Sequence, residues 1–214
     1  MSGLEKLKKD FLGTVFSKGR KYRLYALRYF STFKAYLWLG LKGVQLGKEI
    51  TFMGSPYVRR SPLSSISIGD KCRFRSDSTS NLVGVNRRCL LNTHKEGAII
   101  KIGKRSGFSG VVISAMERVE IGDNLLCGAN VLITDFDFHY VDPTKRHIPG
   151  SKSAPVIIED NVWLGINTVV LKGVRIGENS VIAANSLVIK DIPPNVIAGG
   201  NPCKVIKELA PVAV

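Results

Sequence analysis

Residues 158–188, IEDNVWLGINTVVLKGVRIGENSVIAANSLV, decide the fold of this 214-residue chain. A large aliphatic residue stands at every sixth position: Ile158, Leu164, Val170, Ile176, Ile182 and Val188. A small or β-branched residue stands four positions after each of the first five: Val162, Thr168, Val174, Ser180 and Ser186. Neither a helix, with its period of 3.6, nor a two-sided strand, with its period of 2, explains a period of six. A coil of three short strands does, so the repeat predicts an all-β solenoid, a parallel β-helix.

The same pattern continues upstream with interruptions. An aliphatic residue followed by glycine recurs at Leu46, Ile68, Ile102 and Ile121, and each has a buried-type residue six positions later. We therefore expect the β-helix to occupy residues 44–200, followed by a C-terminal tail at 201–214. Segments 54–65, 76–88 and 91–98 break the register, which predicts that the early coils are irregular or carry short loops.

Composition limits the class of protein. A hydrophobic content of 44% with only 8% aromatic residues suits a solenoid core filled by Ile, Val and Leu. The chain has no uninterrupted apolar run of about 18 residues, so a membrane-spanning helix is not expected. It also lacks the pattern of a signal peptide. Four scattered cysteines without CxxC pairing predict reduced thiols in a cytoplasmic protein.

Residues 1–43 form a distinct basic segment with a helical pattern of apolar residues. They hold ten Lys or Arg against Glu5 and Asp10, which gives +8 of the total net charge of +14. Between Tyr22 and Leu41, basic residues alternate with aromatic ones, which is typical of a helix that contacts an anionic membrane, here at the inner face. A cap over the first coil is the alternative interpretation, because solenoid ends need one. Nucleic-acid contact is not expected.

A loop at 134–155 interrupts the repeat, because Ile133 and Ile158 lie 25 positions apart, which is not a multiple of six. Long excursions from a rigid scaffold commonly carry function. This one contains His139, just after Asp135 and Asp137. An imidazole that is held through one ring nitrogen can accept a proton at the other. From spacing alone, a surface histidine in an acidic loop is an equal alternative.

Three segments together resemble the hexapeptide-repeat acyltransferases, in the branch that O-acetylates sugars. They are the Asp-x-x-Phe-His loop that ends at His139, the run NVWLG at 161–165, and the tail AGGNPCKVIK at 198–207. The resemblance covers residues 100–209 well and residues 44–99 loosely. It implies a left-handed parallel β-helix after the N-terminal helical segment, and a homotrimer with active sites between subunits. It also implies acetyl-coenzyme A as co-substrate, with no permanently bound cofactor and no metal.

The resemblance further implies roles for individual residues. His139 matches the catalytic base, and Asp135, Asp137 or a backbone carbonyl would orient its ring. The acetyl-coenzyme A contacts would be Trp163, Gly165, Ile166, Ala184, Ile189, Lys190, Lys204 and Lys207; the lysine ammonium groups suit phosphate. The carboxylate that galactoside acetyltransferases use for the sugar falls near Ser114, where no acid is in register. Glu117 is the nearest substitute, so galactoside specificity is not expected.

The sequence thus predicts an acetyl-coenzyme A-dependent O-acetyltransferase acting on a carbohydrate hydroxyl of a polysaccharide or lipid-linked glycan precursor. Two alternatives remain open. One is a streptogramin-type antibiotic acetyltransferase of the same superfamily, which differs only in its acceptor. The other is a zinc-dependent hydratase on the same fold, with His94, His139 and His147 as ligands. The position of His139 and His147 in one loop, together with the tail motif, disfavours zinc.

Overall fold

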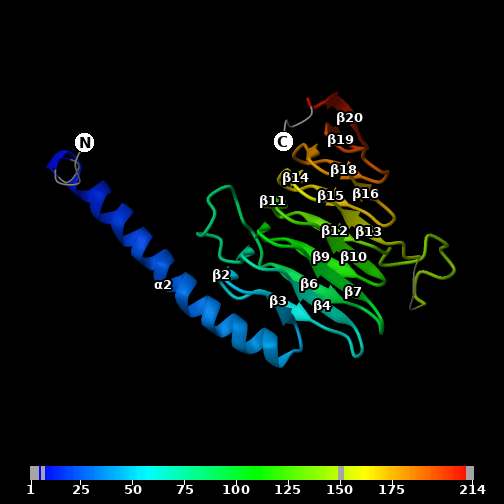
Figure 1. Ribbon diagram of the computed structural model, residues 1–214, viewed down its shortest axis with the longest axis horizontal. Helices are drawn as coiled ribbons and strands as arrows, with labels where there is room; N and C mark the ends of the chain where they lie inside the picture. The colour runs from blue at the N-terminus through cyan, green and yellow to red at the C-terminus, as the bar shows by residue number, and fades with distance from the viewer. Residues whose placement is uncertain (1–4, 6–7, 149–151, 211–214) are drawn as a thin grey trace.

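The computed structural model describes residue 5, residues 8–148 and residues 152–210. Its main body is a left-handed parallel β-helix, and a long helix precedes the first coil (Figure 1). Three parallel sheets form the sides of the solenoid, so the expected fold class is confirmed.

Each coil contributes one strand to each of three sheets. Sheet A contains β1 (Gln45–Leu46), β4 (Ser65–Ile68), β7 (Ile99–Ile102), β10 (Arg118–Ile121), β13 (Val156–Ile158) and β16 (Arg175–Ile176). Sheet B contains β2 (Thr51–Met53), β5 (Arg73–Arg75), β8 (Gly107–Ser109), β11 (Leu126–Ala129), β14 (Trp163–Leu164), β17 (Val181–Ile182), β19 (Val196–Gly200) and β20 (Cys203–Glu208). Sheet C contains β3 (Tyr57–Arg59), β6 (Leu90–Thr93), β9 (Val112–Ala115), β12 (Leu132–Thr134), β15 (Val169–Val170) and β18 (Leu187–Val188). Among the strands of the described residues, only β20 runs antiparallel to its neighbour, β19.

The period of six sets the register of these strands. Residues three repeats apart lie side by side, as Leu164 and Ile182 do in sheet B and Val170 and Val188 in sheet C. The repeating aliphatic residues and the small residues four positions after them are all buried. Each side of the coil therefore contributes one inward aliphatic residue per turn, which is the pattern that the sequence predicts.

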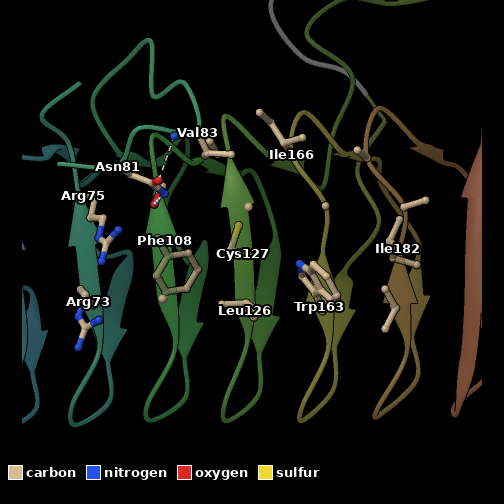
Figure 2. A pocket seen from close by; sticks show the side chains of 18 residues that line it. Arg73, Arg75, Asn81, Val83, Phe108, Leu126, Cys127, Trp163, Ile166 and Ile182 are labelled. Atoms are coloured by element: carbon tan, nitrogen blue, oxygen red, sulfur yellow. Dashed lines mark hydrogen bonds between the residues drawn. The ribbon is translucent and has the colours of Figure 1, made fainter. Parts of the chain in front are cut away.

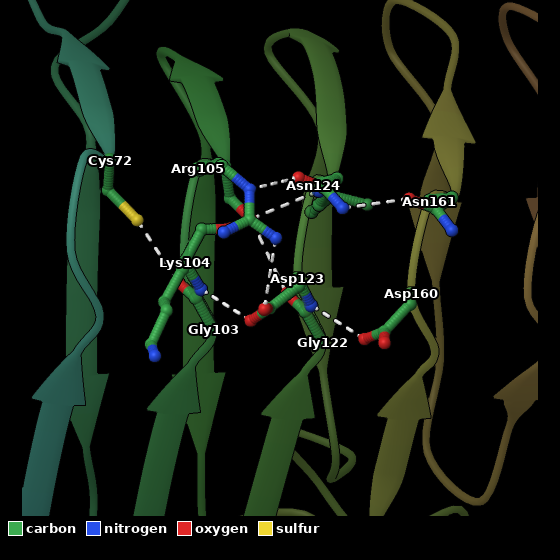
Figure 3. Close-up of polar contacts among 11 residues, drawn as sticks. Cys72, Gly103, Lys104, Arg105, Gly122, Asp123, Asn124, Asp160 and Asn161 are labelled. Carbon is green, nitrogen blue, oxygen red and sulfur yellow. Dashed lines mark hydrogen bonds and ion pairs between the residues drawn. The ribbon is translucent and has the colours of Figure 1, made fainter.

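Polar side chains stabilise the turns from sheet A to sheet B (Figure 3). The backbone N–H of Lys104 donates to Asp123 Oδ1 at 2.7 Å, and the N–H of Asp123 donates to Asp160 Oδ1 at 2.7 Å. The amide of Asn124 donates to Asn161 Oδ1 at 2.8 Å. Asn161 has a φ of 59°, a left-handed conformation that asparagine tolerates better than most residues.

The early coils differ from the regular repeat. In sheet B, the stacked rings of Phe52, Phe74 and Phe108 fill the interior, with centroid distances of 5.3 and 4.8 Å. Residues 76–88 form an irregular insertion between β5 and β6, as expected. Segments 54–65 and 91–98 contain strand residues, including all of β3, joined by short turns. Their strands pair in register with those of the following coils, so the three-sided coil is preserved.

One helix, α2 (Phe11–Leu41), occupies most of the N-terminal segment. Its last turns pack on the first coil, where Ala35 and Leu39 are buried and the N–H of Phe52 donates to Thr32 Oγ1 at 3.0 Å. The first turns of α2 extend away from the solenoid (Figure 1), whereas Arg20 donates to the Thr79 carbonyl at 3.1 Å and Arg23 pairs with Asp77 at 3.6 Å. Large apolar side chains are exposed along the helix: Phe11, Leu12, Phe16, Tyr22, Tyr29 and Phe30. In the described part of the chain, no helix has the length and apolar character needed to cross a membrane.

Candidate active site

The loop that carries His139 leaves the solenoid between β12 of sheet C and β13 of sheet A (Figure 1). Asp135, with an exposed fraction of 0%, anchors its base. One carboxylate oxygen accepts from the N–H of Met116 at 2.7 Å. The other accepts from the N–H groups of Glu117 and Arg118 at 2.7 and 2.5 Å. Three hydrogen bonds to a buried carboxylate stabilise the start of the loop, so Asp135 has a structural task.

A backbone carbonyl holds the imidazole of His139. Its Nδ1 lies 3.0 Å from the carbonyl oxygen of Arg146, and the side chain is exposed. Because a carbonyl only accepts, Nδ1 carries the proton in this contact and Nε2 is left with its lone pair. Asp137 instead accepts a hydrogen bond from Lys172 Nζ at 2.6 Å, which ties the loop to the next coil. Of the groups that the sequence left open for orienting His139, which were Asp135, Asp137 and a backbone carbonyl, the carbonyl of Arg146 is the one that contacts the ring.

His94 lies against the same loop, a neighbour that sequence spacing did not indicate. Its ring packs on Phe136 and Phe138, with centroid distances of 4.8 and 6.3 Å. Burial lowers the pKa of His94, and the charge of Arg59 lowers it further. The zinc alternative needs several ligands around one point, and the described residues contain no group of three His, Cys, Asp or Glu side chains placed to hold a metal ion.

The two acceptor-side candidates differ in access. Glu117 lies beside the loop, where Oε2 accepts a hydrogen bond from Ser153 Oγ at 3.1 Å. Ser114 has an exposed fraction of only 2%. Its hydroxyl does not reach the surface, so direct contact between Ser114 and an acceptor is not supported by this structure.

A groove of about 500 Å³ runs along the outer face of sheet B (Figure 2). Trp163, with an exposed fraction of 50%, lines it together with Gly165, Ile166 and Ala184. The coils approach closely here, because a Cβ on Gly165 would lie 2.5 Å from the backbone nitrogen of Ala184. A side chain at position 165 would therefore disrupt this wall. The groove gathers four of the residues expected to contact acetyl-coenzyme A.

Cys127 also lines this groove but has no nucleophilic character. Its side chain is buried, and burial raises the pKa of the thiol. A thiol that stays protonated is a poor nucleophile.

The other expected donor contacts fall into two groups. Lys204 and Lys207 lie exposed on β20, at the end of the same sheet as the groove. Ile189 and Lys190 follow β18, at the turn from sheet C to sheet A. The His139 loop follows β12 of sheet C, and β12, β15 and β18 are stacked in this order in that sheet. The turn after β18 therefore lies on the same corner of the solenoid as the His139 loop.

One subunit does not bring His139 to the groove. The His139 loop leaves the corner between sheets C and A, whereas the groove lies on sheet B. In a three-sided coil, the corner between two sheets lies opposite the third sheet. Figure 1 shows this loop and the 76–88 insertion, which borders the groove through Asn81 and Val83, on opposite sides of the molecule.

Two groove residues, Arg73 and Arg75, were not among the sequence-predicted candidates. They flank the inward-facing Phe74 on β5. Strand alternation was the available signal, because residues two apart on a strand point to the same face. Nothing in the sequence indicated which outward face would form a groove.

Comparison with known proteins identifies the family. Residues 155–190 match the family model described as bacterial transferase hexapeptide (six repeats). A maltose O-acetyltransferase from Clostridium difficile 630 is 30% identical, with 78% of this chain and 70% of that chain covered and a TM-score of 0.50. The chain belongs to the hexapeptide-repeat acyltransferase family, which confirms the resemblance seen in the sequence.

Two further relatives carry sugar acetyltransferase names. A galactoside O-acetyltransferase of Escherichia coli (strain K12) is 48% identical over 115 residues, which are 53% of this chain and 56% of that protein. A galactoside acetyltransferase in complex with coenzyme A has a TM-score of 0.54 and 26% identity, with 98% of this chain and 92% of that chain covered. The chain spans about half the length of the curated relatives it matches.

Proposed function

We propose that this protein is an acetyl-coenzyme A-dependent O-acetyltransferase that acts on a carbohydrate hydroxyl. The observation that carries the proposal is the groove on sheet B, which gathers Trp163, Gly165, Ile166 and Ala184. Lys204 and Lys207 lie at the end of the same sheet, where ammonium groups suit the phosphates of coenzyme A. The coenzyme A bound to the galactoside acetyltransferase relative supports the same donor.

The active unit is a homotrimer with its sites between subunits. The opposite positions of the groove and the His139 loop in one subunit support this arrangement. A threefold axis parallel to the solenoid axis places corresponding coils of the three subunits at the same height. His139 of one subunit therefore faces the groove of the next subunit near β11 and β14. Ile189 and Lys190, on the same corner as His139, then contact the donor from the second side.

Catalysis proceeds by direct transfer, with His139 as general base. Nε2 accepts the proton of the acceptor hydroxyl while the oxygen attacks the thioester carbonyl. The tetrahedral oxyanion is stabilised by a backbone N–H of a neighbouring coil. Its collapse breaks the C–S bond, and the thiolate of coenzyme A takes the proton back from His139. No enzyme thiol is required.

The acceptor is a polysaccharide or lipid-linked glycan precursor that the protein meets at the cytoplasmic face of a membrane. The composition of α2 supports this proposal. Between Phe11 and Leu41 the chain contains six Lys or Arg and no acid, beside exposed aromatic rings. Basic residues next to Trp, Tyr and Phe suit an anionic bilayer surface. The last turns of α2 cap the first coil, so capping and membrane contact are assigned to different parts of one helix.

Vesicle sedimentation tests the membrane contact. Full-length protein should pellet with vesicles that contain phosphatidylserine and remain in the supernatant with phosphatidylcholine alone. Lys18→Glu/Lys21→Glu should reduce pelleting, whereas Lys101→Glu/Lys104→Glu, a matched pair on the solenoid, should not. Equal pelleting by both variants would contradict a role for α2.

Calorimetric titration with acetyl-coenzyme A tests the activity most directly. We expect saturable binding to the wild type and weaker binding to Lys204→Glu and Lys207→Glu, because each change places a negative charge near the donor phosphates. An absence of binding at millimolar donor would contradict the proposed function.

A further inference from the structure

The groove on sheet B extends well beyond the expected donor contacts. From Trp163 on β14 it crosses β11 and β8 and reaches β5, where Arg73 and Arg75 line it (Figure 2). Among the described residues that line the groove, these two arginines are the only charged ones. One end of the groove is therefore apolar and the other end is strongly positive.

The two arginines have no counter-ion in the described part of the chain. Neither guanidinium takes part in an ion pair there, whereas Arg105, Arg118 and Arg175 each contact a carboxylate. Arg75 is partly buried and stands two residues from Arg73 on one strand face. Burial lowers the pKa of Arg75, and the charge of Arg73 lowers it further. A bound anion would relieve this repulsion between like charges.

The position of the arginines along the groove points to the acceptor. Sheet B places β5 three strands from β14, which is roughly 14 Å at the usual strand spacing of about 4.8 Å. In the proposed function, the donor extends from Trp163 away from β5, toward β20. The arginines thus lie beyond the reacting centre on the side left for the acceptor.

We propose that Arg73 and Arg75 bind an anionic group of the acceptor, a carboxylate or a phosphate, so that the substrate is an acidic saccharide. This inference rests on the proposed function and specifies its substrate class. Planar guanidinium groups match both oxyanions with paired hydrogen bonds. No carboxylate lines the described groove to repel such a ligand.

Positive charge continues from this end of the groove onto α2. Arg75 pairs in register with Met53 of β2. Met53 in turn lines a hollow of about 270 Å³ with Arg20, Lys21 and Arg28 of the helix. Asp77 neutralises Arg23 of the same helix through an ion pair at 3.6 Å, so Arg20, Lys21 and Arg28 carry the positive charge around this hollow.

Calorimetry with three probes tests the proposal on full-length protein saturated with coenzyme A. The probes are tetragalacturonic acid, tripolyphosphate and the neutral maltotetraose. We expect the wild type to bind at least one anionic probe more tightly than maltotetraose. Arg73→Gln/Arg75→Gln should weaken that binding at least about tenfold, the change that follows loss of one charge-assisted hydrogen bond. Lys101→Gln/Lys104→Gln, which removes the same charge from another face, should not.

Each outcome decides one question. A preference for tetragalacturonic acid identifies a sugar carboxylate as the anion, and a preference for tripolyphosphate identifies a phosphate. The proposal is overturned if neither anion binds, if maltotetraose binds equally well, or if both double variants weaken binding alike. Acetyl-coenzyme A is titrated in parallel. If the wild type binds acetyl-coenzyme A but does not prefer an anionic probe, only the proposal of an acidic acceptor is overturned. If the wild type does not bind acetyl-coenzyme A, the proposed function is overturned.

Discussion

The last coils of the solenoid, β13–β18, and the first coils, β1–β9, use the same three-sided frame in different ways. The last coils keep the hexapeptide register, and an amide ladder from Asn161 to Asn179 links their turns at 3.1 Å. The first coils depart from it, with stacked Phe rings inside and an insertion at 76–88. The regular coils hold the end of the groove proposed for the donor, and the irregular coils hold the arginines.

This difference separates two tasks. In the proposed function, the wall for the pantetheine arm of coenzyme A needs closely stacked coils with small residues, which the regular repeat supplies at Gly165 and Ala184. Recognition of a particular acceptor needs side chains that differ from protein to protein. In the proposed acceptor end, the outward-facing Arg73 and Arg75 of β5 and Asn81 of the 76–88 insertion are such side chains. Substitutions should therefore affect the donor and the acceptor separately.

The largest effect is expected at His139, in the loop between the two regions. His139→Ala should lower kcat by about 10²–10⁴-fold, or about 3–5.5 kcal/mol, because the general base is lost. The affinity for acetyl-coenzyme A should stay nearly unchanged in calorimetry. His147→Ala, in the same loop, is the matched control and should retain activity. Near-normal turnover of His139→Ala would remove this residue from the mechanism.

Mixed trimers sharpen the same test. His139→Ala and Trp163→Ala subunits, co-refolded, should regain activity that neither homotrimer has, because some sites then combine an intact His139 with an intact groove. No gain in activity on mixing would mean that each subunit carries a complete site.

The next effect concerns the core of the early coils. Phe74→Ala should lower the free energy of unfolding by about 3–5 kcal/mol, because it leaves a cavity between two stacked rings. Ile182→Val, in the regular part of the same sheet, should cost only about 0.5–1.5 kcal/mol. Urea unfolding at fixed protein concentration measures both. Similar losses would show that the Phe stack gives the first coils no special dependence on packing.

A smaller loss of stability is expected at the base of the loop. Asp135→Leu should cost about 1–3 kcal/mol, since it leaves the partly buried N–H groups of residues 116–118 without their carboxylate acceptor. The loop should also become more mobile, which faster proteolysis within residues 136–148 would detect. Unchanged stability and proteolysis would mean that Asp135 does not anchor the loop.

The smallest effect is expected from the ion pair between Lys172 and Asp137, which lie 2.6 Å apart and are partly exposed. Such pairs contribute about 0.2–1 kcal/mol. Lys172→Met should therefore lower kcat only a few-fold, by loosening the loop around His139, and should leave the donor affinity unchanged. A loss as large as that of His139→Ala would instead place Lys172 in the chemistry.

Sequence by itself determined the repeat, because a period of six admits few backbone solutions and buries the same positions in each turn. It also located the interrupting loop and His139, since a break in register is visible without coordinates. The group that holds His139 was not accessible in this way. Every residue has a backbone carbonyl, so the sequence does not indicate which one contacts a given side chain. The carbonyl of Arg146 contacts the His139 ring because of the path that the loop follows.

Tertiary structure alone decided which distant residues share one surface. Stacking of the coils joins Arg73 on β5 to Trp163 on β14, 90 positions later in the chain, in one groove. It also separates His139 from that groove within one subunit, because a corner of a three-sided coil lies opposite the third side. Such relations depend on which turn each strand occupies and on where insertions shift the count. Local patterns of residues do not record this information.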